Sequence, residues 1–389
     1  MANEVTLTMN EIQELGVIQE TLAGRMTVKT AAGILQRSER QIYRLRQRIR
    51  KNGPQAIAHG NRGKLPAHAR TAAEREHVVT LYKTTYKGYN FTHFAEALQK
   101  EQGIALSDET VRRWLRREGE GGTIRKTRQH RKRRLRKARE GEMLFLDGSP
   151  HHWFGDDHPP CTLLLCCDDA TGKPLGGLFR EQEDRDGCFL LLAKIFKKDG
   201  LPQSFYLDRA SQFKTTRHGG IHSRQCADEP TAFQRAMAEL GIQVIFSYSP
   251  QARGRIERLN GVFQDRLVSE LRRHGIHTLD EANRYLARHF LPAYAKRFGI
   301  APRDPRAAWR PVPPDRDLFD VLCVKERRTV ANDNTLSYRG KIYQLLPTPH
   351  RRHFVKARVE VRQRPDGKIK IVHPQAGVLP FRPCHEKPS

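Results

Sequence analysis

The sequence predicts a multidomain α/β protein in which a central domain with a mixed five-stranded sheet follows two all-α helix-turn-helix domains and precedes a small β barrel. Three observations support this fold class. Apolar residues recur at helical spacing up to about residue 118, residues 141–275 alternate between strand-like and helix-like runs, and residues 317–375 hold short alternating runs separated by turns. A chain of 389 residues is long enough for about two to four domains with separate cores.

The composition points to a polyanionic partner. The chain has 70 Lys and Arg residues against 43 Asp and Glu, a formal charge of +27, and its electrostatic field therefore attracts nucleic acid. No run reaches the roughly 18 apolar residues of a membrane-spanning helix, and the N-terminus lacks a signal-peptide pattern. The seven cysteines include no CxxC pair, which argues against structural zinc and fits a reducing compartment. We expect a soluble, cytoplasmic protein that does not bind membranes.

Residues 1–58 are predicted to form a helix-turn-helix domain. Helical spacing covers 11–22 and 27–35, and Ser38 begins a third helix with Gln41 at the capping-box position. The outward face of this third helix suits a recognition helix in a DNA major groove. An ordinary solvated three-helix bundle is the alternative. The candidate DNA-binding residues on this face are Arg40, Arg44, Gln47 and Arg48.

A second helix-turn-helix domain is predicted at 71–122. The linker before it, 59–70, is rich in Gly and Pro and either lies along DNA or only joins the domains. Predicted helices at 72–86, 91–103 and 107–118 follow, and two tandem modules suit recognition of a long site. The last helix adds the candidate DNA-binding residues Arg112, Arg113, Arg116 and Arg117.

A basic linker covers 123–140. Between Arg125 and Arg139, ten of fifteen residues are Lys or Arg and none is acidic. Like charges at this density repel each other, so we expect this segment to contact DNA or to lack fixed structure without it. A solvated charged helix is the alternative. The candidate DNA-binding residues here are Arg131, Lys132, Arg133 and Arg134.

The central α/β domain is predicted at 141–275. The first three strands are joined by short turns and predict an antiparallel meander, whereas the later strands are separated by helices and extend the sheet in parallel. The predicted strands are Met143–Asp147, Cys161–Asp168, Leu175–Arg180, Ser204–Asp208 and Gln243–Phe246. The predicted helices are Asp186–Lys198, Thr231–Leu240 and Gly254–Arg273.

Three acids stand out in this domain. Asp147 and Asp208 each end an apolar strand, and Glu257 lies on the helix that follows the sequence Ser-Pro-Gln-Ala-Arg-Gly-Arg-Ile-Glu-Arg-Leu-Asn-Gly at 249–261. This arrangement resembles the catalytic core of DDE transposases and retroviral-type integrases, which have a ribonuclease-H-like fold. The tandem helix-turn-helix domains and the C-terminal barrel extend the resemblance to bacterial insertion-sequence transposases over most of the chain.

The resemblance implies a function and a site. Asp147, Asp208 and Glu257 are then the catalytic residues and the ligands of two Mg²⁺ ions, for which Mn²⁺ substitutes, with Asp147 bridging both metals. The implied partners are double-stranded DNA, as terminal inverted repeats and as target, and a second copy of the chain on that DNA. The implied location is the bacterial nucleoid. Asp208 and Glu257 are 49 positions apart, wider than is typical of integrase-like relatives, and the polar segment 214–229 accounts for the extra length as an insertion.

Other polar residues compete for roles in the site. Asp168 and Asp169 also end a strand, but the Ala-Thr-Gly-Lys that follows marks a hairpin in which Asp is a favoured turn residue. We therefore interpret this pair as turn residues. Other acids and histidines are weaker candidates: Asp156, Asp157, Asp265, Glu270, His151 and His152. Asn260 either hydrogen-bonds near the metals or caps local backbone.

Arginines around Glu257 are candidates for holding phosphate, because guanidinium binds phosphate oxygens in pairs. The alternative is a charged helix surface. These candidates are Arg253, Arg255 and Arg258.

Downstream, 276–316 is predicted as an amphipathic helix followed by a proline-rich linker, 317–375 as the small antiparallel β barrel and 376–389 as a tail. The sequence as a whole predicts a transposase that binds terminal inverted repeats and then cuts and joins DNA strands. A catalytically silent DNA-binding regulator derived from such an enzyme is one alternative, and a nuclease without strand transfer is another.

Overall fold

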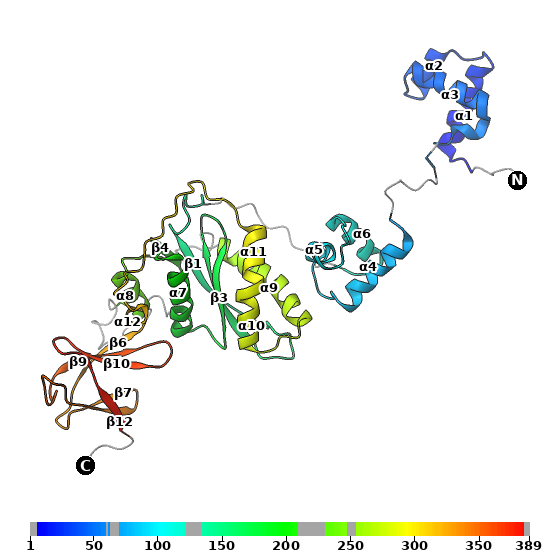
Figure 1. Ribbon diagram of the computed structural model, residues 1–389. Helices are drawn as coiled ribbons and strands as arrows, with labels where there is room; N and C mark the ends of the chain where they lie inside the picture. Colours follow the sequence, from blue (N-terminus) through cyan, green and yellow to red (C-terminus); the bar gives the residue numbers. More distant parts are fainter. Residues whose placement is uncertain are drawn as a thin grey trace, which may run out of the picture. The chain divides into compact units, whose positions relative to one another are not determined.

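The computed structural model describes residues 6–59, 61–62, 70–121, 134–208, 230–246 and 254–384 (Figure 1). The chain divides into two compact units, Met1–Glu76 and His77–Ser389. No helix in the described ranges is long and apolar enough to cross a membrane.

The first unit contains the predicted three helices, α1 (Met9–Leu22), α2 (Val28–Ile34) and α3 (Glu39–Asn52), followed by a 3-10 turn, η1 (Pro54–Ile57). Capping boxes begin α1 at Thr8 and α3 at Ser38. The tight turn between α2 and α3 passes through Gln36 in the left-handed region, at φ 49°. Its core residues are Ile18, Ala31, Ile42, Leu45, Ile49 and Ile57. Regular capping and one apolar face per helix fix the position of α3 in this unit.

The second helical group comprises α4 (Ala72–Thr84), α5 (Phe91–Glu101) and α6 (Asp108–Arg117). Its core is largely aromatic: Tyr82, Tyr86, Tyr89, Phe94 and Trp114 are buried, with Leu98, Val111 and Leu115. α6 buries one stripe and leaves Arg113, Arg116 and Arg117 exposed.

The central sheet has the strand order β3-β2-β1-β4-β5. Its strands are β1 (Leu144–His151), β2 (Cys161–Asp168), β3 (Pro174–Arg180), β4 (Ser204–Leu207) and β5 (Gln243–Phe246). β1, β2 and β3 pair antiparallel, whereas β4 pairs parallel with both β1 and β5. The predicted mixed five-stranded sheet is confirmed, and this arrangement is consistent with a ribonuclease-H-like core.

One strand boundary differs in a way that matters for the site. β1 was expected to end at Asp147, but its pairing with β2 continues to His151, opposite Cys161. Asp147 therefore lies within β1, paired with Leu165, and not at its tip. Gly148 and Pro150 hide this continuation in the sequence, because both are depleted in strands.

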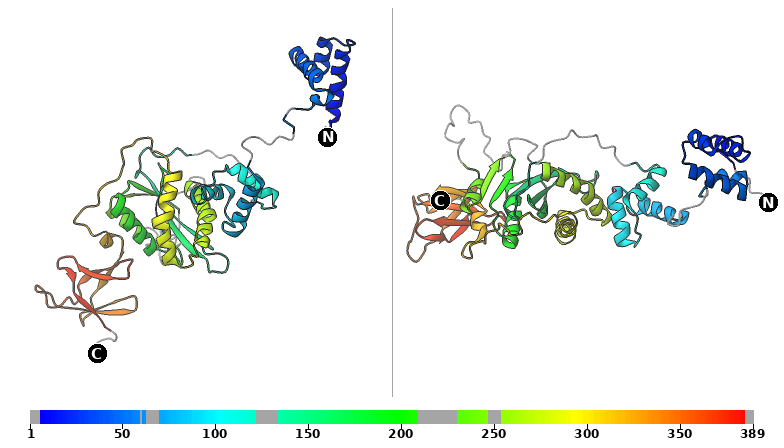
Figure 2. Two further views of the ribbon diagram at one scale, coloured as in Figure 1. Left: turned by 45° about the vertical axis from the view of Figure 1, so that its right-hand side comes forward. Right: turned by 90° about the horizontal axis from the view of Figure 1, so that it is seen from above.

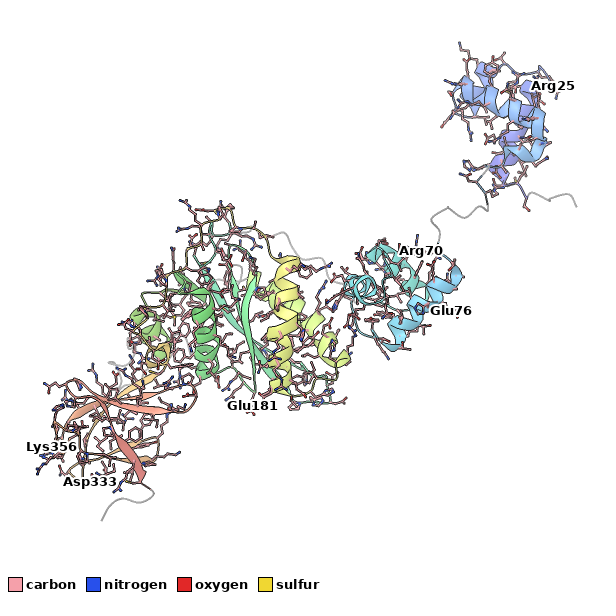
Figure 3. The ribbon with its side chains drawn as sticks, viewed as in Figure 1. Arg25, Arg70, Glu76, Glu181, Asp333 and Lys356 are labelled. Atoms are coloured by element: carbon pink, nitrogen blue, oxygen red, sulfur yellow. The ribbon has the colours of Figure 1, made fainter. Side chains whose placement is uncertain are left out.

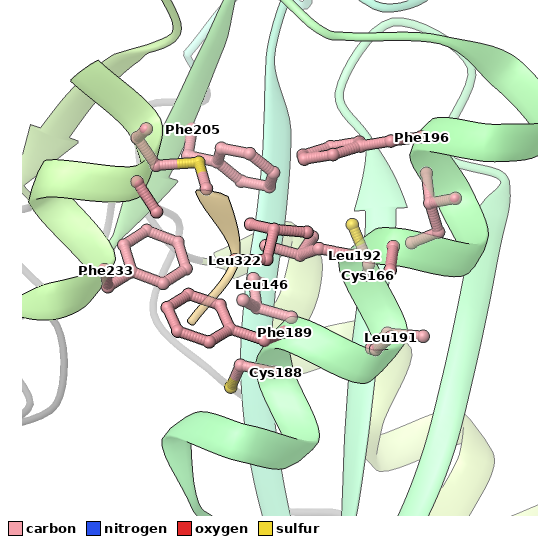
Figure 4. Close-up of a cluster of buried hydrophobic side chains, with 14 of the residues drawn as sticks. Leu146, Cys166, Cys188, Phe189, Leu191, Leu192, Phe196, Phe205, Phe233 and Leu322 are labelled. Carbon is pink, nitrogen blue, oxygen red and sulfur yellow. The ribbon is translucent and has the colours of Figure 1, made fainter. Parts of the chain in front are cut away.

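Helices cover both faces of the sheet (Figure 2). Alternation along β1 sends Leu144 and Leu146 into a core shared with α7 (Arg185–Asp199) and α8 (Ala232–Glu239). In this core Phe189 stacks on Phe233, as Figure 4 shows.

Met143 and Phe145 enter the opposite core, which α9 (Gly254–Arg273) covers. α10 (Leu279–Tyr285), the π-helical segment η3 (Leu286–Phe290) and α11 (Leu291–Phe298) complete that core. The predicted amphipathic helix downstream of 276 is thus three consecutive helical segments.

The C-terminal part begins with α12 (Leu318–Val321) and continues as seven short strands. They are β6 (Val324–Thr329), β7 (Thr335–Tyr338), β8 (Lys341–Leu345), β9 (Arg358–Gln363), β10 (Ile369–His373), β11 (Gly377–Leu379) and β12 (Phe381–Cys384). Turn chemistry is local: Asp333, labelled in Figure 3, accepts hydrogen bonds from the backbone N–H and hydroxyl of Thr335.

The predicted closed barrel is not confirmed. The strands form two antiparallel sheets, β11-β10-β9-β6 and β12-β8-β7, that share one apolar core. Residues 377–384, expected to be a tail, supply one strand to each sheet. The chain crosses between the sheets at Pro380, which has no N–H to donate to a ladder.

Candidate active site

Asp147 and Asp208 lie on neighbouring parallel strands. The register pairs Leu144 with Phe205 and Phe145 with Tyr206. Continued for two residues, this register places Asp208, which directly follows β4, beside Asp147. Alternate residues of a strand face the same side, so both aspartates share the face of the sheet that α9 covers. Both are partly buried.

α9 docks on β1 through two side-chain hydrogen bonds. Asn260 Nδ2 donates to Asp147 Oδ2 over 2.8 Å, and Gln264 Nε2 donates to Ser149 Oγ over 2.9 Å. The spacing matches, because residues four apart share a helix face and residues two apart share a strand face. Asn260 is 8% exposed, and its Oδ1 has no hydrogen-bond partner in the described part of the chain. Asn260 therefore contacts the candidate site directly and does not cap backbone.

Glu257 lies in the first turn of α9 and is exposed. It is three residues before Asn260, so the two side chains are neighbours on the helix surface. Within the described ranges no group of three or more His, Cys, Asp or Glu side chains is arranged to hold a metal. The structure thus brings together the strands of Asp147 and Asp208 and docks the Glu257 helix on them, without assembling the three carboxylates into one ligand group. The segments 209–229 and 247–253, next to Asp208 and Glu257, lie outside the described residues.

The donor set suits hard divalent cations. Mg²⁺ prefers oxygen ligands and is usually bound through one or two carboxylates with positions left for substrate. Asp147 on β1 and Asp208 just after the adjacent β4 offer such donors. So does the amide oxygen of Asn260, which has no hydrogen-bond partner among the described residues. The residues present fit a Mg²⁺ site in their chemistry.

The competing acids after β2 are structural, as interpreted from the sequence. Asp168 is buried and accepts hydrogen bonds from Gly141 N at 2.9 Å and from Thr171 N and Oγ1 at 2.7 and 2.8 Å. Burial nevertheless raises the pKa of the Asp168 carboxyl above its usual value. Asp169 accepts hydrogen bonds from the Arg134 and Arg255 side chains.

The other acids and histidines that were weaker candidates for the site either have hydrogen-bond or ring partners elsewhere or are exposed in a loop. Asp265 accepts a hydrogen bond from Asn90 at 2.6 Å. His152 Nδ1 lies 3.2 Å from the His158 carbonyl, and burial lowers the pKa of His151, whose ring lies edge-on to Trp153. Asp156 and Asp157 are exposed, as expected for their loop.

The candidate DNA-binding residues that the structure describes fall into two groups. Arg48 donates to the Ile57 carbonyl, Arg112 pairs with Glu109, and Arg134 and Arg255 pair with Asp169. These four already have partners in the protein. The exposed residues are Arg40, Arg44, Gln47, Arg113, Arg116, Arg117 and Arg258. Arg131, Lys132, Arg133 and Arg253 lie outside the described residues.

A polar interface between α5 and the second half of α9 was not predicted from sequence. Arg266 makes two hydrogen bonds with Glu96, at 2.8 and 3.0 Å, and Arg273 pairs with Glu101. Ser269 donates to the Gly88 carbonyl at 3.2 Å. The second helical group therefore docks on the same helix that carries Glu257. In the sequence, the charged residues of this interface look like solvated surface residues. The α5 segment and the α9 segment are each polar, and they are some 170 residues apart.

Glu270 forms the titratable centre of this interface. Its Oε1 lies 2.9 Å from His93 Nε2, and its Oε2 accepts from the Tyr285 hydroxyl at 2.9 Å and lies 3.6 Å from His274 Nε2. Burial alone would raise the pKa of Glu270, but the hydrogen bonds from His93 and Tyr285 outweigh it and lower the pKa to about 2 from the usual 4.5.

This shift predicts an acid dependence. Because the folded pKa lies below the unfolded one, the stabilisation is complete above pH 4.5 and is lost as the pH falls toward 2. Glu270→Gln should therefore lower the free energy of unfolding at pH 6 but flatten its fall between pH 5 and 3. Urea unfolding across that pH range measures this, and parallel curves for both proteins would reject the role of Glu270.

Comparison with known proteins agrees with these observations. A family model described as a helix-turn-helix domain matches residues 15–64. A protein of Sinorhizobium fredii named as transposase y4bF is 33% identical over 369 residues, covering 94% of this chain and 79% of that protein. The transposase for insertion sequence IS1202 of Streptococcus pneumoniae is 32% identical over 405 residues, covering 93% and 84%.

Among solved structures, the simian T-cell lymphotropic virus intasome in complex with a PP2A regulatory subunit matches with 14% identity and a TM-score of 0.32. The match covers 79% of this chain and all of that one. At so low a TM-score this likeness is not evidence for the fold. The evidence is the identity to the two transposases over nearly the whole chain, and by that identity the chain belongs to the family of insertion-sequence transposases.

Proposed function

We propose that this transposase cuts DNA at the terminal inverted repeats of its insertion sequence and joins the released 3′ ends to target DNA. The observation that carries this proposal is the pairing of β1 with β4, which sets Asp147 beside Asp208, with the helix of Glu257 docked on Asp147 through Asn260. Membership of the transposase family supports the reaction class.

Phosphodiester transfer is slow without help because the scissile phosphate is anionic and its leaving alkoxide is poor. Mg²⁺ bound at Asp147, Asp208 and Glu257 would activate the attacking hydroxyl and stabilise the departing oxygen. The chain's own residues hold these carboxylates in place. Asn260 orients Asp147 by donating to one of its oxygens, and Gln264 fixes the helix one turn further on.

DNA recognition is assigned to the exposed polar faces. On α3, the side of the helix away from the apolar core exposes Arg40, Arg44 and Gln47. A helix that reads base edges in the major groove requires such an exposed polar face. Arg113, Arg116 and Arg117 do the same on α6. Arg258, exposed beside Glu257, is placed to contact a phosphate near the cut. At least two copies of the chain would act together on the paired ends.

A DNA-binding regulator without chemistry is the second candidate, favoured by the partnered state of Arg134 and Arg255 near the site. One experiment separates the candidates: incubate the protein with labelled repeat-end DNA and target plasmid in Mg²⁺ and resolve the products. The proposed function predicts cleaved ends and joined products. Binding without cleavage would identify a regulator, and cleavage without joined products would identify a nuclease.

A further inference from the structure

One buried carboxylate connects the basic linker, the central strands and the helix of Glu257. The side chain of Asp169, in the turn after β2, has no exposed surface. Its Oδ1 accepts from both Arg134 and Arg255, and its Oδ2 accepts from Lys137 N at 2.7 Å. Arg255 also donates to the Arg134 carbonyl at 2.5 Å. We call Asp169, Arg134 and Arg255 the arginine clamp.

The clamp includes or contacts a residue two positions before each of the three candidate ligands. The Arg134 guanidinium lies 5.9 Å from the ring centre of Phe145 and 6.0 Å from that of Tyr206, and these two rings contact each other edge-on. Phe145 and Tyr206 each stand two residues before a candidate aspartate, and Arg255 stands two residues before Glu257. The clamp therefore contacts β1 and β4 through Arg134 and includes Arg255 from the first turn of α9.

A buried ion cluster of this kind is weak evidence for stability, because desolvating the charges offsets most of their attraction. Burial lowers the pKa of Arg255, although Asp169 opposes that effect. The cluster does fix geometry. Residues 255 and 257 are some 200° apart around the helix, so holding Arg255 on one side sets the direction in which Glu257 points on the other.

The rest of α9 is held by other contacts. Asn260 and Gln264 bind β1, and Arg266 and Arg273 bind α5. Losing the clamp would therefore free the first turn without detaching the helix. We propose that Asp169 is a positioning residue that holds Glu257 in register with Asp147 and Asp208. This inference rests on the proposed function, and it also makes Arg134, within the basic linker 123–140, part of the site's support.

The test compares three variants, Asp169→Asn, Arg255→Gln and the double variant of the two. The control is Arg272→Gln, which removes an exposed charge from the last turn of the same helix. Asn keeps the size of Asp169 but cannot balance two guanidinium groups. Two quantities are measured on the full-length protein bound to repeat-end DNA: the Mn²⁺ affinity by calorimetry, and the rate of strand transfer against Mn²⁺ concentration. Thermal unfolding and repeat-end binding confirm that each variant is folded.

Asp169→Asn and Arg255→Gln should each weaken Mn²⁺ binding about 10- to 100-fold, the range for residues that support a metal ligand. The double variant should bind Mn²⁺ no more weakly than the single variants, because each single change already removes the same contact between Asp169 and Arg255. Arg272→Gln should bind Mn²⁺ as the wild type does. Wild-type Mn²⁺ affinity in both single variants, or additive losses in the double variant, would overturn the inference. Absence of strand transfer in the wild type would instead reject the proposed function and leave the Mn²⁺ measurement to decide on the clamp.

Discussion

Asp147→Asn, Asp208→Asn and Glu257→Gln should each reduce strand cleavage and strand transfer by at least about a thousandfold while leaving repeat-end binding within about twofold. Each change removes a negative oxygen ligand without changing side-chain size. Losing several kcal/mol of charge stabilisation in the transition state corresponds to about three powers of ten in rate. The faces of α3 and α6 that we propose to bind DNA are untouched, so binding should persist. Rates come from single-turnover reactions on labelled repeat-end DNA.

Asp156→Asn is the matched control for these variants. Asp156 follows β1 closely but is exposed in a loop, so its loss should leave the rate unchanged. Wild-type cleavage by any one of the three variants would remove that residue from the site. Equal loss of cleavage in the Asp156 variant would show that the assay responds to net charge.

Arg266→Met should loosen the second helical group, α4 to α6, from the core. Arg266 is 9% exposed, and besides its two hydrogen bonds to Glu96 its guanidinium lies 4.9 Å from the Phe298 ring centre. Breaking a buried ion pair costs about 3–5 kcal/mol, and Glu96 keeps Arg297 as a partner at 2.6 Å, so we expect about 3 kcal/mol. Hydrogen exchange of the α5 amides measures this loss as a lower opening free energy.

Arg288→Met is the control. Arg288 is an exposed arginine in η3, and replacing it with Met makes the same change in side-chain shape as the Arg266 variant. It should leave exchange in α5 unaltered. Unchanged exchange in the Arg266 variant would mean that the ion pair does not hold α5 on α9, and the coupling of this helical group to α9 would lose its basis.

Much of the fold was predictable because its signals are local. The capping boxes at Thr8 and Ser38, the apolar stripe of α6 and the apolar strands of the sheet each depend on neighbours in sequence. The sequence also predicted that the later strands extend the sheet in parallel, which the parallel pairing of β4 with β1 and β5 confirms. The metal ligation of these residues and of Glu257 stays a prediction.

The parts that were missed depend on contacts distant in sequence or on sheet edges. Arg134 and Arg255 look like phosphate ligands in the sequence, yet a buried aspartate 35 and 86 residues away binds both. Closure of the C-terminal strands into a barrel cannot be derived from alternation, which gives the face of each residue and not its neighbouring strand. The strand pairing in the structure supplies this information: β6 pairs with β9 in one sheet, and β12 pairs with β8 in the other.

The most direct test of the central claim is metal specificity in Asp208→Cys. A thiolate is a soft ligand that binds the hard Mg²⁺ poorly and accepts softer divalent ions more readily. If Asp208 is a metal ligand, this variant should be inactive in strand transfer with Mg²⁺ and regain a measurable rate with Mn²⁺, whereas the wild type works with both. Strand transfer by Asp208→Cys at the wild-type rate in Mg²⁺ would contradict the account.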